Sequence, residues 1–147
     1  MQIPIASDLQ TQLTTAVADW LAAKGYEPIP YGALLGGSTP WPTVGHEIAS
    51  LVGAGQFQQA ILFCWTGTGI SIAANKVPGV RAALCWDAET ARGAKKWNDA
   101  NILCLSLRYT SEAVAKEILE AWFSTEASAD ADDQACLRML EAMEKRP

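Results

Sequence analysis

A cysteine at the end of an apolar run, followed at once by a glycine-rich turn, is the segment best suited to chemistry in this sequence. The segment reads Cys64-Trp65-Thr66-Gly67-Thr68-Gly69-Ile70-Ser71. Glycines let backbone N–H groups approach a ligand closely, and a helix beginning after the turn adds partial positive charge. Together these features predict binding of an anion, or of an oxyanion that develops during a reaction.

The same turn does not match two common nucleotide-binding motifs. The residue three places after Gly69 is Ile72, so the turn is not a full G-x-G-x-x-G, and the chain has no G-K-[ST] of a Walker A loop. The chain has a single histidine and no C-x-x-C pair, which argues against a zinc site. We therefore expect no cofactor and no metal.

Composition narrows the class of protein further. Half of the 147 residues are apolar, the formal net charge is -5, and no basic stripe is present, which argues against nucleic-acid binding. No segment has the length and apolarity of a membrane span, and the N-terminus does not read as a signal peptide. We expect a cytoplasmic protein in which the four cysteines are reduced.

Short apolar runs alternate with helical patterns, which predicts βα units and a parallel sheet. The expected strands are Gln2 to Ala6, Glu27 to Tyr31, Ala60 to Cys64, Val80 to Cys85 and Asn101 to Leu107. Two prolines in the second run predict an edge strand, and the apolar last three predict strands buried on both faces. Ligands bind outside the carboxyl ends of such strands, so the loops after residues 6, 31, 64 and 85 are expected to form the site, with the loop after residue 107 as a weaker fifth candidate.

Helical patterns fill the gaps between the runs, and Ser7 and Asp8 are expected to cap the first helix. Further helices are predicted around Val44 to Val52, Gly69 to Asn75, Ala88 to Trp97, Ser111 to Phe123 and about residues 131 to 145. Gly32 to Pro42 is expected to be a loop and Thr125 to Asp133 a linker. We expect residues 1–147 to form one domain whose last helix docks on its own body or on a partner subunit.

Longer motifs resemble the family of ribose-5-phosphate isomerase B and the galactose-6-phosphate isomerase subunits. They are GTGISIAANK from Gly67 to Lys76, the run PGVRAALC that ends at Cys85, and NDANIL from Asn98 to Leu103. The resemblance implies a three-layer α/β/α sandwich with a five-stranded parallel sheet. It also implies a homodimer, or a larger assembly built from it, whose sites lie between subunits and whose C-terminal helix crosses to the partner.

The resemblance implies an aldose–ketose isomerase that works through an enediolate. Cys64 matches the family's base and Thr66 a hydroxyl that assists proton traffic. The amides of Gly67, Thr68 and Gly69 would hold the enediolate oxygen, whereas Asn98 and Asp8 would bind the sugar. Plainer interpretations stay open: Cys64 as a buried thiol, Asp8 as a helix cap, and Asn98 as a turn residue.

Several positions depart from the family pattern. Leu9 and Trp97 replace histidines, Trp65 replaces a glycine, and Pro40-Trp41 replaces an Asp-Tyr pair. The C-terminal arginine–histidine cluster is reduced to Arg138. Indoles cannot act as bases, but Trp41, Trp65 and Trp97 offer flat faces that stack on sugar rings, unless they only fill volume.

These departures predict an isomerase with an altered substrate, a sugar or a sugar-derived ligand. One alternative is a catalytically impaired homologue that binds a small molecule. Another is a protein with a vestigial site whose role is to form an assembly.

Overall fold

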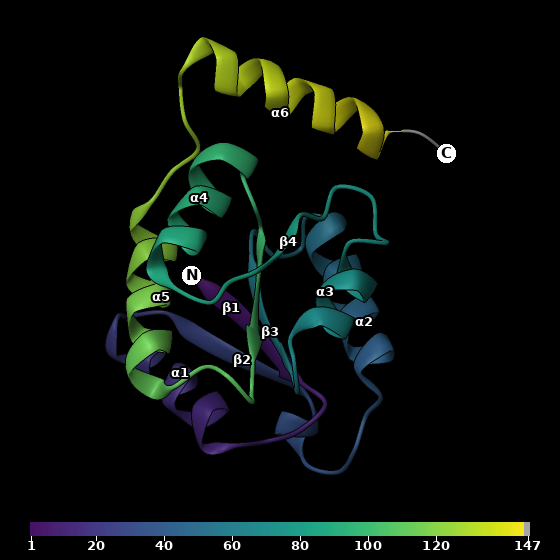
Figure 1. The fold of residues 1–147 in the computed structure, drawn as a ribbon. Coiled ribbons are helices and arrows are strands. Elements are labelled where there is room, and N and C mark those ends of the chain that lie inside the picture. Colours follow the sequence, from purple (N-terminus) through teal and green to yellow (C-terminus); the bar gives the residue numbers. More distant parts are fainter. Residues whose placement is uncertain (146–147) are drawn as a thin grey trace.

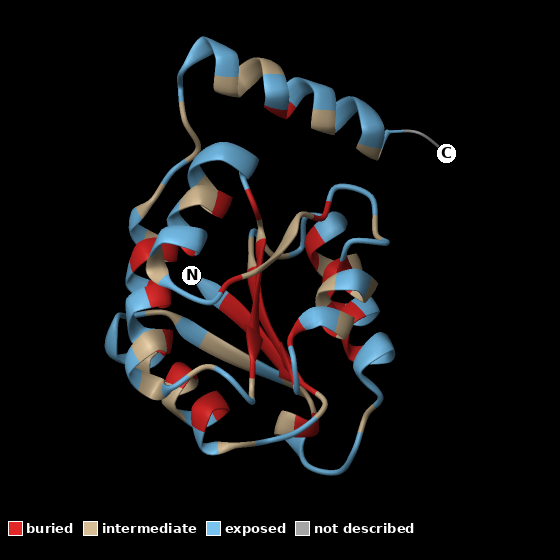
Figure 2. Ribbon diagram, in the orientation of Figure 1, coloured by how far each residue is buried: buried red, intermediate tan, exposed pale blue. Residues whose placement is uncertain are grey.

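The computed structural model of the chain describes residues 1–145. At its centre is a sheet of parallel strands in the order β2-β1-β3-β5-β4. The strands are β1 (Gln2–Ser7), β2 (Glu27–Gly32), β3 (Ala60–Cys64), β4 (Ala82–Leu84) and β5 (Ile102–Ser106). The proline-containing β2 lies at one edge, as its sequence predicts. Strands β1, β3 and β5 are the buried centre (Figure 2).

Helices cover both faces of the sheet, so the predicted three-layer α/β/α architecture is confirmed (Figure 1). One face carries α1, α4 and α5, and the other carries α2 and α3. The helices are α1 (Gln12–Ala23), α2 (Trp41–Gly53), α3 (Thr68–Ala74), α4 (Ala88–Asn98), α5 (Glu112–Ser124) and α6 (Ala131–Glu144). None of the helices within residues 1–145 is long and apolar enough to cross a membrane.

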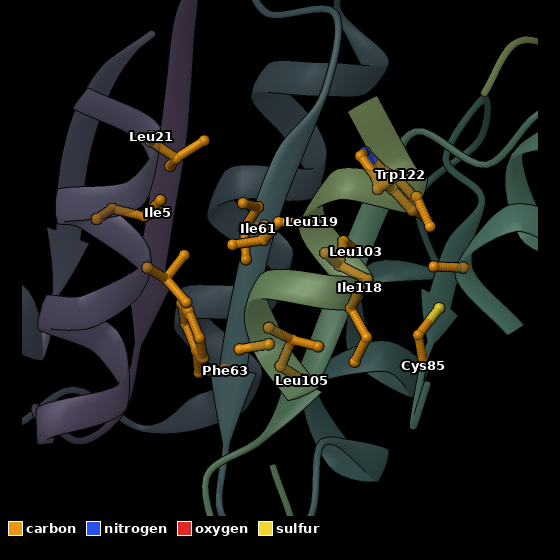
Figure 3. Packing of buried hydrophobic residues seen from close by; sticks show 14 of the residues in the cluster. Ile5, Leu21, Ile61, Phe63, Cys85, Leu103, Leu105, Ile118, Leu119 and Trp122 are labelled. Atoms are coloured by element: carbon orange, nitrogen blue, oxygen red, sulfur yellow. The ribbon is translucent and has the colours of Figure 1, made fainter. Parts of the chain in front are cut away.

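The core between the sheet and α5 contains the largest buried side chains (Figure 3). Phe63 of β3 and Leu105 of β5 pack there beside Ile118 of α5. Trp122 is 1% exposed, and its indole Nε1 donates a hydrogen bond of 2.8 Å to Gln59 Oε1. Each such buried side chain contributes about 1.5–3 kcal/mol, which holds β3 and the residue before it against α5.

Three local predictions were wrong. Thr11, and not Ser7 or Asp8, is the residue at which α1 begins, and the Thr14 hydroxyl bonds back to its amide and carbonyl at 3.1 and 2.7 Å. The Ser7 hydroxyl instead closes its own turn onto Leu9. Strand β4 is limited to Ala82–Leu84 and is a half-buried edge strand. The expected loop from Gly32 to Pro42 includes the end of β2, the 3₁₀ helix η1 (Ala33–Leu35) and the start of α2 at Trp41.

The last helix, α6, lies apart from the two helical layers, beyond the end of α4 (Figure 1). Its surface is mostly exposed, and only Leu137 is buried (Figure 2). Asp130 caps it by accepting hydrogen bonds from the amides of Asp132 and Asp133. The linker therefore ends at residue 130, a few residues before the predicted end.

Candidate active site

The Cys64 segment lies at the carboxyl edge of the sheet, where the sequence places it. Cys64 is the last residue of β3 and is 4% exposed. Gly67 adopts a φ of 78°, and a Cβ there would lie 2.4 Å from Leu84 Cδ1. Only glycine therefore permits the tight turn that leads from Cys64 into α3.

Hydrogen bonds from the loop after β5 hold this turn in place. The amide of Leu107 donates to Cys64 O at 3.0 Å, and the amide of Arg108 donates to Trp65 O at 3.0 Å. The Ser106 hydroxyl donates to the same Trp65 oxygen at 2.9 Å. The turn is thus a fixed part of the sheet edge.

A cavity of about 230 Å³ opens beside Cys64. It is lined by most of the residues predicted for the site, namely Asp8, Trp41, Cys64, Trp65, Thr66, Thr68 and Gly69. They come from the ends of β1 and β3 and from the first turns of α2 and α3. The first amides of α3 have no acceptor within their own helix and can serve a ligand.

The polar groups of the cavity suit proton transfer. The hydroxyls of Thr66 and Thr68 share a hydrogen bond of 2.7 Å. The Asp8 Oδ1 atom is buried and has no hydrogen-bond partner among the described residues. Burial raises the pKa of the Asp8 carboxyl above its ordinary value of 3.8. A buried acceptor without a partner is costly unless a ligand completes it, so Asp8 is available to a donor such as a sugar hydroxyl.

Cys64 is the cysteine with access to this cavity. Burial and the charge of Asp87 raise the pKa of the Cys85 thiol to about 12. Burial also raises the pKa of Cys104 well above its ordinary value. Because the thiolate is the reactive form, these two thiols are inert at neutral pH.

Asn98 and Trp97 lie far from Cys64 within one chain. Helix α4 ends at Asn98, at the amino edge of the sheet, because it runs back from the carboxyl ends of the strands. Ala60, at the opposite end of β3 from Cys64, is paired with Ile102 of β5. Ile102 follows Asn98 by a few residues, so Asn98 lies near that opposite end. At about 3.3 Å per residue, β3 alone separates the two edges by roughly 13 Å.

The amino edge carries a second cavity, of about 500 Å³, between α6 and the segment that leads into β4. Asn98 lines it together with Arg81, Leu140 and Glu144. Arg138 is exposed on α6. The Trp97 ring packs back along α4, where its Cζ3 atom lies 3.0 Å from the place that a Cβ on Gly93 would take. The three tryptophans therefore do not surround one cavity of a single chain.

Two arginines beside these cavities were not among the predicted site residues. Arg108 follows β5 and adjoins the Cys64 turn through its amide. Its signal in the sequence is a basic residue directly after a buried strand, at the edge where ligands bind. Arg81 bonds Glu144 through Nε at 2.6 Å and Asn98 O through Nη1 at 3.1 Å, so it joins α6 to the end of α4.

Comparison with known proteins places this geometry in a family. Residues 3–140 match the family described as ribose/galactose isomerase. The D-erythrulose-4-phosphate isomerase of Pectobacterium atrosepticum is 37% identical over 86% of the chain and 84% of that protein. Ribose-5-phosphate isomerase B of Escherichia coli is 33% identical over 86% and 84%.

Solved structures give the same answer for the backbone. The structure of Clostridium thermocellum ribose-5-phosphate isomerase B superimposes with a TM-score of 0.90 at 38% identity. The match covers 99% of this chain and 98% of that one, so the departures at individual positions leave the architecture unchanged.

Proposed function

Because the chain belongs to the ribose/galactose isomerase family of sugar-phosphate isomerases, we propose that it interconverts an aldose and a ketose at the cavity beside Cys64. The observation that carries the proposal is that one thiol, two bonded hydroxyls and the first amides of α3 surround one small cavity. Its relatives are named for sugar phosphates of four, five and six carbons, so the family alone does not identify the substrate.

In the proposed reaction the Cys64 thiolate removes the proton from C2 of the open-chain aldose. The electron pair of the C–H bond forms the C1–C2 double bond of an enediolate, and negative charge moves to O1. The amides of Thr68 and Gly69 stabilise this oxygen. Cys64 then returns the proton to C1, while the proton of the C2 hydroxyl moves to O1 through the Thr66–Thr68 hydroxyl pair.

The other residues of the cavity bind the substrate. Asp8 accepts a hydrogen bond from a sugar hydroxyl, which completes its unpartnered oxygen. Arg108 does not line the cavity, but its backbone amide bonds the Cys64 turn, and we assign its exposed side chain to the anionic end of the sugar. The indoles of Trp41 and Trp65 cover the apolar faces of the ligand.

We also propose that the working form is a homodimer. Asn98 and Arg138 lie at the amino edge, away from Cys64, so both can serve the Cys64 cavity only if they come from a second copy. Helix α6 exposes Met139 and Met143, at 64% and 61%, which gives a partner an apolar surface. The free cysteines and the family's metabolic chemistry support a cytoplasmic location.

The test of catalysis is hydrogen exchange at carbon. The protein is incubated in deuterated water with aldoses and ketoses of four to six carbons, with and without a terminal phosphate. We expect deuterium at C1 or C2 of at least one sugar, and a loss of about 10²- to 10⁴-fold in Cys64→Ala, the range for general-base catalysis. Cys85→Ala is the matched control, because Cys85 directly follows strand β4 but lines neither of the two cavities.

Exchange that survives in Cys64→Ala would refute the role of the thiol. Binding of a sugar phosphate without any exchange would instead favour a catalytically impaired binding protein. Sedimentation of the protein at micromolar concentration tests the assembly, for which a purely monomeric species is the contrary result.

A further inference from the structure

Arg81 joins two segments that lie far apart in the sequence, the end of α4 and the end of α6. Its Nε and Nη2 atoms donate hydrogen bonds to the two carboxylate oxygens of Glu144, and its Nη1 atom donates to Asn98 O at 3.1 Å. The Arg81 and Glu144 side chains are partly shielded from water. Because a guanidinium is planar, its three bonded nitrogens fix the direction of both partners at once.

The main chain of Arg81 is anchored to the sheet. Its amide donates to Asn101 Oδ1 at 2.8 Å, and Asn101 Nδ2 donates to Gly79 O at 2.9 Å. In return, Arg81 O accepts hydrogen bonds from the amides of Asn101 and Ile102, at 3.0 and 3.2 Å. Ile102 is the first residue of the central strand β5, so the guanidinium extends from a backbone that the sheet holds in place.

The end of α4 needs such support. Asn98 is the last residue of the helix, and Asp99 leaves it with a φ of 46°, in the left-handed region that is unfavourable for a residue with a Cβ. The Asn98 side chain is exposed and lines the cavity at the amino edge. Its direction therefore depends on the contacts that hold this helix end, and the bond from Arg81 to its carbonyl is one of them.

Helix α6 is the other partner of Arg81 and has little support of its own. Leu137 is its one buried residue, whereas Met139 and Met143 are exposed and offer a surface to the second copy in the proposed dimer. A partner subunit that holds α6 also holds the Glu144 carboxylate beside the guanidinium. Arg81 then carries this constraint to the end of α4.

We propose that Arg81 is a positioning residue through which α6 sets the direction of Asn98 for sugar binding in the Cys64 cavity of the second copy. This inference rests on the proposed function and on the proposed dimer, in which Asn98 binds the sugar. Arg81 does not touch the substrate in this arrangement. Sugar binding nevertheless depends on the ion pair between Arg81 and Glu144, so the docking of α6 and the affinity for the sugar are linked.

Calorimetric titration with two aldonic acid phosphates tests the inference without turnover. The probes are 4-phospho-D-erythronate and 5-phospho-D-ribonate, which carry a carboxylate in place of the aldehyde. In Arg81→Gln we expect the Kd of the acid that binds wild-type protein more tightly to rise about 10-fold, the size expected for one misplaced hydrogen bond. Combined with Asn98→Ala, it should add less than about 3-fold to the effect of Asn98→Ala alone, because Arg81 acts through Asn98.

Arg92→Gln is the matched control for Arg81→Gln. Arg92 also pairs with a glutamate, Glu89, but it lies on the exposed side of α4 and lines neither cavity. We expect its Kd to equal that of the wild type. Glu144→Gln is a milder second variant, which leaves Arg81 in place and removes only the charge on α6, and we expect its Kd to rise about 3-fold. Circular dichroism and sedimentation check the fold and the dimer of each variant.

The outcomes separate this inference from the proposed function. Weaker binding in Arg81→Gln that vanishes in the Asn98→Ala background, without carbon-bound deuterium in any sugar, would support the positioning role and overturn catalysis. Cys64-dependent exchange with an unchanged Kd in Arg81→Gln would support catalysis and overturn the positioning role. Additive effects of the two substitutions, loss of the dimer in Arg81→Gln, or binding of neither acid by wild-type protein at millimolar concentration would each overturn the inference.

Discussion

A partly buried ion pair helps to attach α6 to the body of the protein, which gives a quantitative prediction. Arg81 Nε and Nη2 bond the two carboxylate oxygens of Glu144 at 2.6 and 3.3 Å. The two side chains are 16% and 18% exposed, so water screens the pair only partly. The Glu144 carboxylate raises the pKa of Arg81 through this hydrogen bond, so the guanidinium stays charged.

Hydrogen bonds to charged groups contribute about 1.5–3 kcal/mol each, and for this half-buried pair we take about 2 kcal/mol in total. Removal of Glu144 should therefore raise the opening constant of the end of α6 by roughly 30-fold. In Glu144→Ala we expect the amides in the last two turns of α6 to exchange with deuterium faster by that factor. Mass spectrometry of peptides from α6 measures the change.

Glu141→Ala is the control for this experiment. Glu141 lies on the same helix and pairs with Lys145 at 2.6 Å, but those side chains are 52% and 72% exposed. Such a surface pair contributes about 0.3–0.5 kcal/mol, so exchange should change by less than roughly 3-fold. Equal acceleration in the two variants would refute the reasoning, because it would show that helix propensity and not the buried pair determines the opening of α6.

Two further predictions concern the turn and the carboxylate of the site. Gly67→Ala should destabilise the fold by about 3 kcal/mol in urea unfolding, because the left-handed backbone and the contact with Leu84 both oppose a Cβ. Gly79→Ala, with a φ of 77° and open space around it, should cost only about 1 kcal/mol, and equal losses would contradict the steric argument. Asp8 has a raised pKa in the fold, so its contribution to stability is present below about pH 3.8 and is lost as pH rises through the raised value. Asp8→Asn should therefore raise the melting temperature at pH 7 more than at pH 3, and the same shift at both values would argue against burial as the cause.

The sheet and most helices could be predicted from the sequence because each depends on a local pattern. Buried central strands give unbroken apolar runs, and the last helix, expected about residues 131 to 145, is observed at Ala131–Glu144. Strand β4 was predicted too long because Arg81 leaves the ladder. Its amide bonds the side chain of Asn101 at 2.8 Å, an interaction between distant segments that no local pattern indicates.

The site was predictable to the extent that topology determines it. The carboxyl-edge rule brings Asp8, Cys64 and Thr66 to one cavity, and the structure places them there. The same topology requires α4 to end at the amino edge, so Asn98 was expected beside the sugar only from the resemblance and a second subunit. The contact between Trp41 and Gly69 could not be read from the sequence, since it depends on the distance between two packed helices.

The location of Cys64 and Asn98 at opposite edges of the sheet has a genetic consequence. In the proposed dimer, a Cys64→Ala chain and an Asn98→Ala chain are each inactive alone, because every pocket takes one residue from each copy. A mixed dimer combines both defects in one pocket and leaves the other intact. Two null alleles expressed together should thus complement each other in trans, to roughly a quarter of wild-type activity for random one-to-one pairing in a two-fold assembly.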